Sequence, residues 1–270
     1  MIAWADNQPV FTIGGNSINT SVSLSNGNHY VVVQAWDIYG NVYTAGGYYI
    51  GVSGNNDNPT YQMIQAMQGW RSCGSCAGRN GQGPDTPHSM TQWEPTPSLT
   101  GQAIEYWIGP AQAYSGALWW KQLGSNEGAT HFVYDMYFYV KNPGAAQSLE
   151  FDMNQSAGQR KFIFGTQCDI QYTHQWNIWD TANAQWVLTG IPCSAPQAYT
   201  WNHLTLEFVR NQYQTAFVSV TLNGNKSYIN RTFDTFGVNA SELNTAVQLD
   251  GDVYATAYSL WVDQMSVTAW

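Results

Sequence analysis

The stretch TWNHLTLEFVRNQYQTAFVSVTLNG, Thr200 to Gly224, constrains the fold more than any other part of the chain. Between Trp201 and Val209, apolar and polar side chains alternate with the period of two that marks a half-buried strand. A second such run, Phe217 to Leu222, ends in Asn223-Gly224, a pair that accepts the positive φ angles of a tight hairpin turn. The stretch therefore predicts two antiparallel strands joined by a short polar connection.

Composition agrees with a β-protein that has a large core. The chain has 270 residues, enough for one large β-sandwich and a smaller piece, with 15% aromatic and only 10% charged residues. The formal net charge of −9 and the lack of a Lys/Arg cluster argue against nucleic acid or anionic membranes as partners. Because no apolar run approaches the ~18 residues that span a bilayer, membrane insertion is not expected.

Short runs with turn signals between them follow one another after Ser98, and no convincing helical periodicity interrupts them. This pattern predicts an all-β fold, an antiparallel two-sheet sandwich. The expected strands are Ile104–Ile108, Ala117–Leu123, Thr130–Lys141, Ser148–Asn154, Lys161–Cys168, Trp176–Asp180, Gln185–Thr189, Trp201–Val209, Phe217–Leu222, Lys226–Phe233, Ala246–Leu249 and Ala257–Ala269.

Two motifs give these strands a family resemblance. The pattern W-x-H-L-x-L-x-F followed by V-x-L-N-G resembles the central hairpin of concanavalin-A-like and laminin-G-like jelly rolls, and Tyr258–Val267 resembles the closing strand of laminin-G-like domains. The resemblance covers residues 61–270. It implies two curved antiparallel sheets, of which the concave one usually meets sugars.

The first 52 residues predict a smaller β-domain. The segment Gly27–Asp37 resembles the F strand of bacterial immunoglobulin-like modules, in which G-x-H-x-V-x-V-x-A-x-D precedes a turn. Such a sandwich needs about seven strands, and residues 1–52 offer only four or five, so we expect an incomplete unit whose exposed edge could pair with a partner strand. Residues 53–60 form a polar linker to the jelly roll at 61–270. The whole arrangement resembles uncharacterised secreted bacterial proteins.

The four cysteines predict two disulfides and an oxidising compartment. We expect Cys168 to pair with Cys193, and Cys73 to pair with Cys76 in a small local ring. The C-x-x-C sequence has two rival interpretations. A redox motif requires a thioredoxin-like βαβ context, and half a zinc site requires a second cysteine pair with metal-ligand spacing. The start of the chain lacks a signal peptide, so we expect a fragment of a longer, secreted or cell-surface protein.

The segment LEFDMNQ, residues 149–155, is the sharpest candidate for chemistry. Alternation places Glu150, Asp152 and Asn154 on one strand face, next to Gln155. Concanavalin-like retaining glycoside hydrolases carry E-x-D-x-E or E-x-D-x-x-E, and the resemblance makes Glu150 the nucleophile and Asp152 its neighbour. The last acidic position holds an amide here, which cannot act as a general acid. A second carboxyl would have to be Asp152 itself or come from Glu105 or Glu207.

Aromatic residues between Cys168 and Cys193 form a second candidate site. Tyr172, His174, Trp176, Trp179 and Trp186 lie there, and indoles stack on the apolar CH faces of sugar rings. Alternation sets Trp176 opposite Trp179, so both cannot share one face of a regular strand. The competing interpretation of each tryptophan is packing in the core.

These observations support three hypotheses. The leading one is a carbohydrate-recognition module that uses Glu150, Asp152 and Asn154 for sugar hydroxyls and Trp176 or Trp179 for stacking, with Gln155 and His174 also in the ligand site. The alternatives are a retaining glycoside hydrolase and a structural, adhesive or filament subunit. We expect no cofactor, although Asp250 and Asp252 form a weak candidate site for Ca²⁺ at a turn.

Overall fold

The computed structural model describes residues 1–270 except 7, 19–21, 23–26, 53–59 and 78–81. Contacts divide the chain into two units, Met1–Asn58 and Pro59–Trp270. The linker expected at 53–60 lies outside the described residues apart from Thr60.

The first unit is a single antiparallel sheet with strand order β2-β1-β3-β4. Its strands are β1 (Ile2–Ala5), β2 (Gln8–Thr12), β3 (Gly27–Trp36) and β4 (Val42–Val52). The edge strands of this sheet are β2 and β4. Two alanines, Ala3 and Ala5, are its only buried apolar side chains among the residues described.

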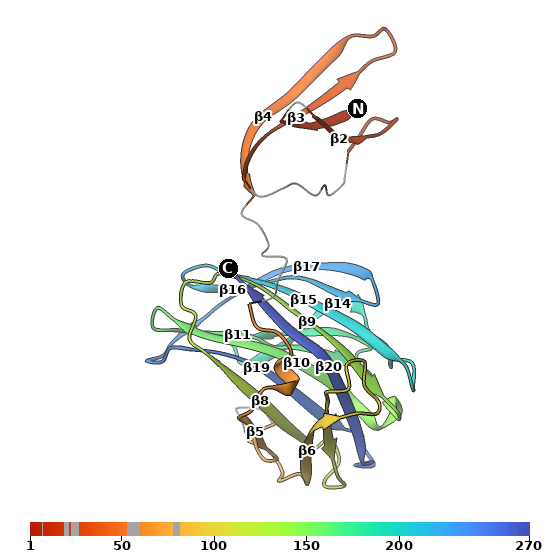
Figure 1. Ribbon diagram of the computed structural model, residues 1–270, viewed down its shortest axis with the longest axis vertical. Coiled ribbons are helices and arrows are strands. Elements are labelled where there is room, and N and C mark those ends of the chain that lie inside the picture. The colour runs from red at the N-terminus through yellow and green to blue at the C-terminus, as the bar shows by residue number, and fades with distance from the viewer. Residues whose placement is uncertain (7, 19–21, 23–26, 53–59, 78–81) are drawn as a thin grey trace. The chain divides into compact units, whose positions relative to one another are not determined.

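The second unit is a sandwich of two antiparallel sheets, as the sequence predicts (Figure 1). One sheet has the order β17-β16-β15-β9-β20-β7-β6. Its strands are β6 (His88–Glu94), β7 (Ala103–Ile108), β9 (His131–Val140), β15 (Trp201–Arg210), β16 (Gln214–Leu222), β17 (Asn225–Asp234) and β20 (Tyr258–Ala269).

The second sheet has nine strands, in the order β14-β13-β12-β10-β19-β8-β5, with β11 paired to β10 and β18 paired to β11. Its strands are β5 (Trp70–Cys73), β8 (Gly116–Gly124), β10 (Ala146–Ala157), β11 (Arg160–Phe164), β12 (Thr166–Asp169), β13 (Gln175–Asp180), β14 (Gln185–Pro192), β18 (Phe236–Gly237) and β19 (Glu242–Gly251).

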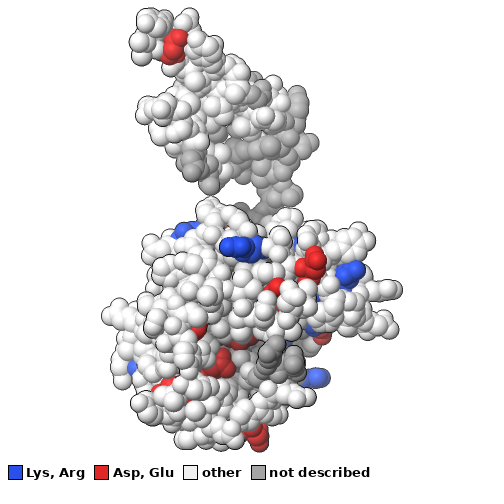
Figure 2. Space-filling model, turned by 180° about the vertical axis from the view of Figure 1, so that it is seen from behind, with Lys and Arg blue, Asp and Glu red and all other residues white. Residues whose placement is uncertain are grey.

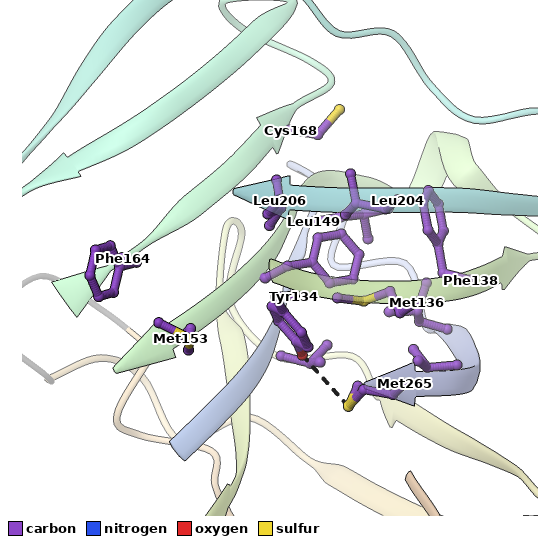
Figure 3. Close-up of a cluster of buried hydrophobic side chains, with 14 of the residues drawn as sticks. Tyr134, Met136, Phe138, Leu149, Met153, Phe164, Cys168, Leu204, Leu206 and Met265 are labelled. Atoms are coloured by element: carbon purple, nitrogen blue, oxygen red, sulfur yellow. Dashed lines mark hydrogen bonds between the residues drawn. The ribbon is translucent and has the colours of Figure 1, made fainter. Parts of the chain in front are cut away.

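The core lies between these sheets and follows from the alternation. Strand β10 contributes Leu149, Phe151 and Met153 to it, all at most 1% exposed. Side chains from β9 and β15 meet them from the other sheet (Figure 3). Tyr134 on β9 also donates a hydrogen bond to the Met265 sulfur on β20. Because side chains alternate along a strand, residues 149, 151 and 153 of β10 face the core and residues 150, 152 and 154 face outward from the sandwich.

Helical structure is minor in the described residues. Two short 3₁₀ turns, η1 (Ile64–Ala66) and η3 (Pro143–Ala145), lead into β5 and β10. Gln65 in η1 joins Ser98, Leu99 and Thr100 in hydrogen-bonding the buried carboxylate of Asp263 on β20. No helix of the described residues is long and apolar enough to cross a membrane.

Candidate functional site: a cleft over the Glu150 strand

The outward face of the nine-stranded sheet holds a cleft with a volume of about 860 Å³. This volume lies within the range of small-molecule sites, roughly 300–1,000 Å³. Residues from β8, β10, β11, β13, β14, β18 and β19 line it, together with the disulfide-bonded Cys76 and its neighbour Ala77. The lining residues are Cys76, Ala77, Leu118, Glu150, Asp152, Ile163, Gly165, Trp179, Thr181, Ala184, Gln185, Trp186, Phe236 and Gln248.

Strand register builds the floor of the cleft. Glu150 on β10 lies directly between Gln248 on β19 and Gln167 on β12, and Asp152 is the next outward-facing residue of β10. Leu118 on β8 continues the row beyond Gln248. Four neighbouring strands thus place polar groups and one leucine side by side.

The β13–β14 hairpin forms one wall. Trp179 and Trp186 are paired across it, and their rings meet edge to face with centroids 5.2 Å apart. Both line the cleft and are only partly buried. The Cys168–Cys193 disulfide closes the ends of the segment that carries this hairpin. A rigid aromatic wall therefore faces the polar floor.

Gly165 joins wall and floor. It interrupts the single strand expected at Lys161–Cys168, which the structure divides into β11 and β12. The backbone N–H of Thr166 then donates to Asp152 Oδ1 at 3.1 Å. A Cβ at position 165 would lie 2.8 Å from Trp179 Cβ and 3.5 Å from Asp152 Oδ1. Only glycine therefore fits at this close approach.

Burial changes the acid–base behaviour of the floor. Glu150 and Asp152 are each 8% exposed. Burial, with the negative charges of Asp152 and Asp250, raises the pKa of Glu150 well above its usual range. Burial also raises the pKa of Asp152 to about 7, although hydrogen bonds from Glu150 and from the Thr166 N–H act in the opposite direction. The Glu150 and Asp152 carboxyls are hydrogen-bonded to each other, so the protonation of one depends on that of the other.

A third buried carboxyl, Asp250, adjoins this pair. Burial raises its pKa to about 6, against hydrogen bonds from Ser148 Oγ and Gln248 Nε2. Neither lysine nor arginine occurs among the described residues that line the cleft. Figure 2 shows that one face of the molecule is mostly uncharged, with separate acidic and basic side chains, in keeping with the 10% charged residues of the chain.

The structure brings together only part of the predicted sugar site. Glu150, Asp152 and Trp179 line the cleft. Asn154 lies on the same strand face as the two carboxyls, where its amide donates to Asn244 Oδ1 at 3.1 Å. His174 is exposed at the turn before β13 and is not among the lining residues.

Gln155 and Trp176 lie away from the cleft, on the core side of the sheet. Gln155 is fully buried, and its Nε2 donates to the carbonyl oxygens of Asn126 and Ala129. Trp176 is 3% exposed and lies opposite the disulfide-bonded Cys168. The alternation that separates Trp176 from Trp179 therefore places one indole in the core and the other in the cleft.

The two remote carboxyls considered as catalytic partners belong to the other sheet. Glu105 is on β7, and Glu207 on β15 is hydrogen-bonded to Ser219 and paired with Lys226. Neither lines the cleft.

The residues considered for Ca²⁺ hydrogen-bond within the chain. Asp252 accepts from the backbone N–H groups of Tyr254 and Thr256 and from the Thr256 hydroxyl. Within the described part of the chain, no group of three or more His, Cys, Asp and Glu side chains is arranged to hold a metal ion.

Sequence reasoning missed several wall and floor residues. Ile163, Phe236, Gln248 and Leu118 come from strands whose register with β10 cannot be read from sequence. Trp186, which is among the aromatic candidates predicted from the sequence, lies directly opposite Trp179 in the β13–β14 pairing.

Comparison with known proteins supports the fold. The sequence matches no protein-family model, and a search of curated proteins gives no match. Among solved structures, an endo-β-1,4-glucuronan lyase from the fungus Trichoderma reesei is similar, with a TM-score of 0.50 and 10% identity over 79% of this chain and 96% of that one.

Two weaker similarities are to carbohydrate-binding proteins. A carbohydrate-binding module structure of the β-sandwich superfamily gives a TM-score of 0.43 at 9% identity, covering 92% of this chain and 76% of that one. The Emp47p carbohydrate recognition domain gives 0.40 at 9% identity, covering 79% and 99%. At 10% identity, the likeness to the glucuronan lyase supports the fold and establishes no activity.

Proposed function

We propose that the protein is an extracellular carbohydrate-binding module and that the cleft over β10 is its sugar site. The single observation that carries the proposal is the pairing of an aromatic wall, Trp179 and Trp186, with a floor of carboxyl and amide groups in one cleft. Indoles stack on the apolar faces of sugar rings, and carboxyls and amides hydrogen-bond sugar hydroxyls. The two disulfides support an oxidising compartment.

Binding without hydrolysis follows from the same geometry. A retaining hydrolase needs two carboxyls about 5–5.5 Å apart in separate roles, nucleophile and acid/base. Here Glu150 and Asp152 hydrogen-bond each other, and the third position of the hydrolase pattern holds Asn154. The floor therefore suits recognition of hydroxyl groups better than bond cleavage.

Calorimetric titration of β-linked oligosaccharides against single variants tests the proposal. We expect Trp179→Ala and Trp186→Ala each to weaken binding about tenfold, the effect of losing one stacked ring. Trp36→Ala removes a 43% exposed tryptophan from the first unit and should leave affinity unchanged. Binding that survives both cleft substitutions would contradict the proposed site. Reducing-sugar release that Glu150→Gln abolishes would replace binding by hydrolysis as the function.

A further inference from the structure

Two donor side chains that line the cleft, Gln248 and Thr181, are already hydrogen-bonded within the chain. The Nε2 atom of Gln248 donates to Ala77 O at 3.2 Å and to Asp250 Oδ1 at 3.1 Å. The Thr181 hydroxyl donates to Ile163 O at 3.4 Å. These lining donors are therefore used within the chain, whereas the Glu150 and Asp152 carboxyl oxygens line the cavity.

The charges of the residues in and around the cleft also favour a ligand that donates hydrogen bonds. The lining includes two acidic side chains, a third is buried next to Gln248, and no described lining residue carries a positive charge. The lysine on the neighbouring strand β11, Lys161, is paired with Glu242. Arg79 lies outside the described residues. A carboxylate ligand would therefore meet buried negative charge without a described partner, a costly arrangement.

An ammonium group fits what the floor and wall offer. It carries three N–H donors and no acceptor, so it matches the carboxyl oxygens of the cleft floor. Indole faces also attract cations. Trp179 and Trp186 therefore complement the same group that the carboxyls favour.

We propose that the cleft selects sugars that carry a protonated amine, such as oligomers of 2-amino-2-deoxyglucose, over neutral sugars and over uronates. This inference rests on the proposed carbohydrate-binding function and names its ligand class. It predicts ion pairing with the ionised carboxylate of Asp152 while the indoles stack on the sugar ring.

Four probes of equal length test the selectivity by calorimetry: de-N-acetylated chito-oligosaccharide, its N-acetylated counterpart, a cello-oligosaccharide and an oligouronate. The first two share a backbone and differ in charge. We expect the amine-bearing oligomer to bind about tenfold more tightly than either neutral one, the gain of a charge-assisted hydrogen bond, and the uronate to bind most weakly. Equal affinity for charged and neutral oligomers would overturn this inference and leave the proposed function intact, whereas binding of none of the four would overturn the proposed function.

Substitutions separate the carboxyls from other sources of selectivity. Asp152→Asn should remove the tenfold preference for the amine-bearing oligomer. Asp234→Asn is a matched control, since this exposed aspartate ends β17 in the other sheet. Loss of the preference in Arg79→Gln or Asp234→Asn, or a requirement for added Ca²⁺, would contradict a role for the cleft carboxyls.

Proton release gives a second measurement that stacking alone would not change. The titratable groups that act on Asp152 are Glu150, Asp250 and, from the core side, Tyr134. Because burial raises the pKa of Asp152 to about 7, much of this pair holds protons at pH 6, and an ammonium ligand favours the ionised form. Titrations at pH 6 in buffers of different ionisation enthalpy should show proton release with the amine-bearing oligomer and none with the cello-oligosaccharide. Release that persists unchanged in Asp152→Asn would contradict the assignment.

Discussion

At the scale of single residues, Gly165 decides whether the cleft can form. Its position lets the Thr166 N–H reach Asp152 and brings the hairpin against the floor. We expect Gly165→Ala to lower the free energy of unfolding by about 1–3 kcal/mol, the usual cost of overpacking, and to weaken sugar binding. Urea denaturation and calorimetric titration measure the two effects.

Gly128→Ala is the matched control for that change. A Cβ at position 128 would meet no atom within 4 Å, and the residue does not have a positive φ. We expect its stability to stay within about 0.5 kcal/mol of the parent chain. If Gly165→Ala and Gly128→Ala behave alike, the close packing of β12 against the hairpin does not hold the cleft in shape.

At the scale of elements, the β10–β19 pair should make stability fall as pH rises. The folded chain raises the pKa of Asp152 to about 7 and that of Asp250 to about 6, from ordinary values of 3.8. Below about pH 4 the two carboxyls are protonated in both the folded and the unfolded chain, so they do not lower the free energy of unfolding. Between about pH 4 and pH 7 the unfolded chain releases these protons while the folded chain still holds them. Once the pH has passed the folded-state pKa, the free energy of unfolding has fallen by roughly 1.4 kcal/mol for each unit by which folding raises that pKa.

Chemical denaturation at several pH values measures this slope. The comparison is between the parent chain and Asp152→Asn, whose amide stays neutral, because other carboxylates contribute a background that both proteins share. We expect the parent chain to lose more stability than the variant between pH 4 and pH 7. Curves of the same shape for both proteins would show that Asp152 titrates normally in the folded state.

Elements also show how far sequence reasoning reaches. Alternation suffices to predict β9, β15 and β16 and to separate the core and outward faces of β10, because one face packs in the apolar core and the other faces water. The break at Gly165 could not be predicted, since the atom that requires it is Trp179 Cβ, which lies outside the local pattern around position 165. Similarly, Gln248 joins the floor through pairing with Glu150 across about a hundred residues, which local patterns do not encode.

At the scale of the whole molecule, the buried apolar side chains are divided very unequally between the two units. The buried hydrophobic cluster runs from Ile64 to Ala269, and it includes no described residue of Met1–Asn58. The first unit buries only two alanines and one histidine in its described part. A single sheet with so little buried surface is not expected to stabilise a neighbour.

Residues 59–270 alone should therefore fold and keep the sugar site. We expect the truncated chain to unfold in one cooperative transition, with a Tm within about 2 °C of the main transition of the full chain, because the cluster that supplies its stability is complete. Its affinity for oligosaccharides should match that of the full chain, since every described lining residue lies after position 75. Scanning calorimetry and titration of both chains measure this. A truncated chain that folds with the same Tm yet binds no sugar would move the recognition surface to the first sheet, where β2 and β4 are the edge strands.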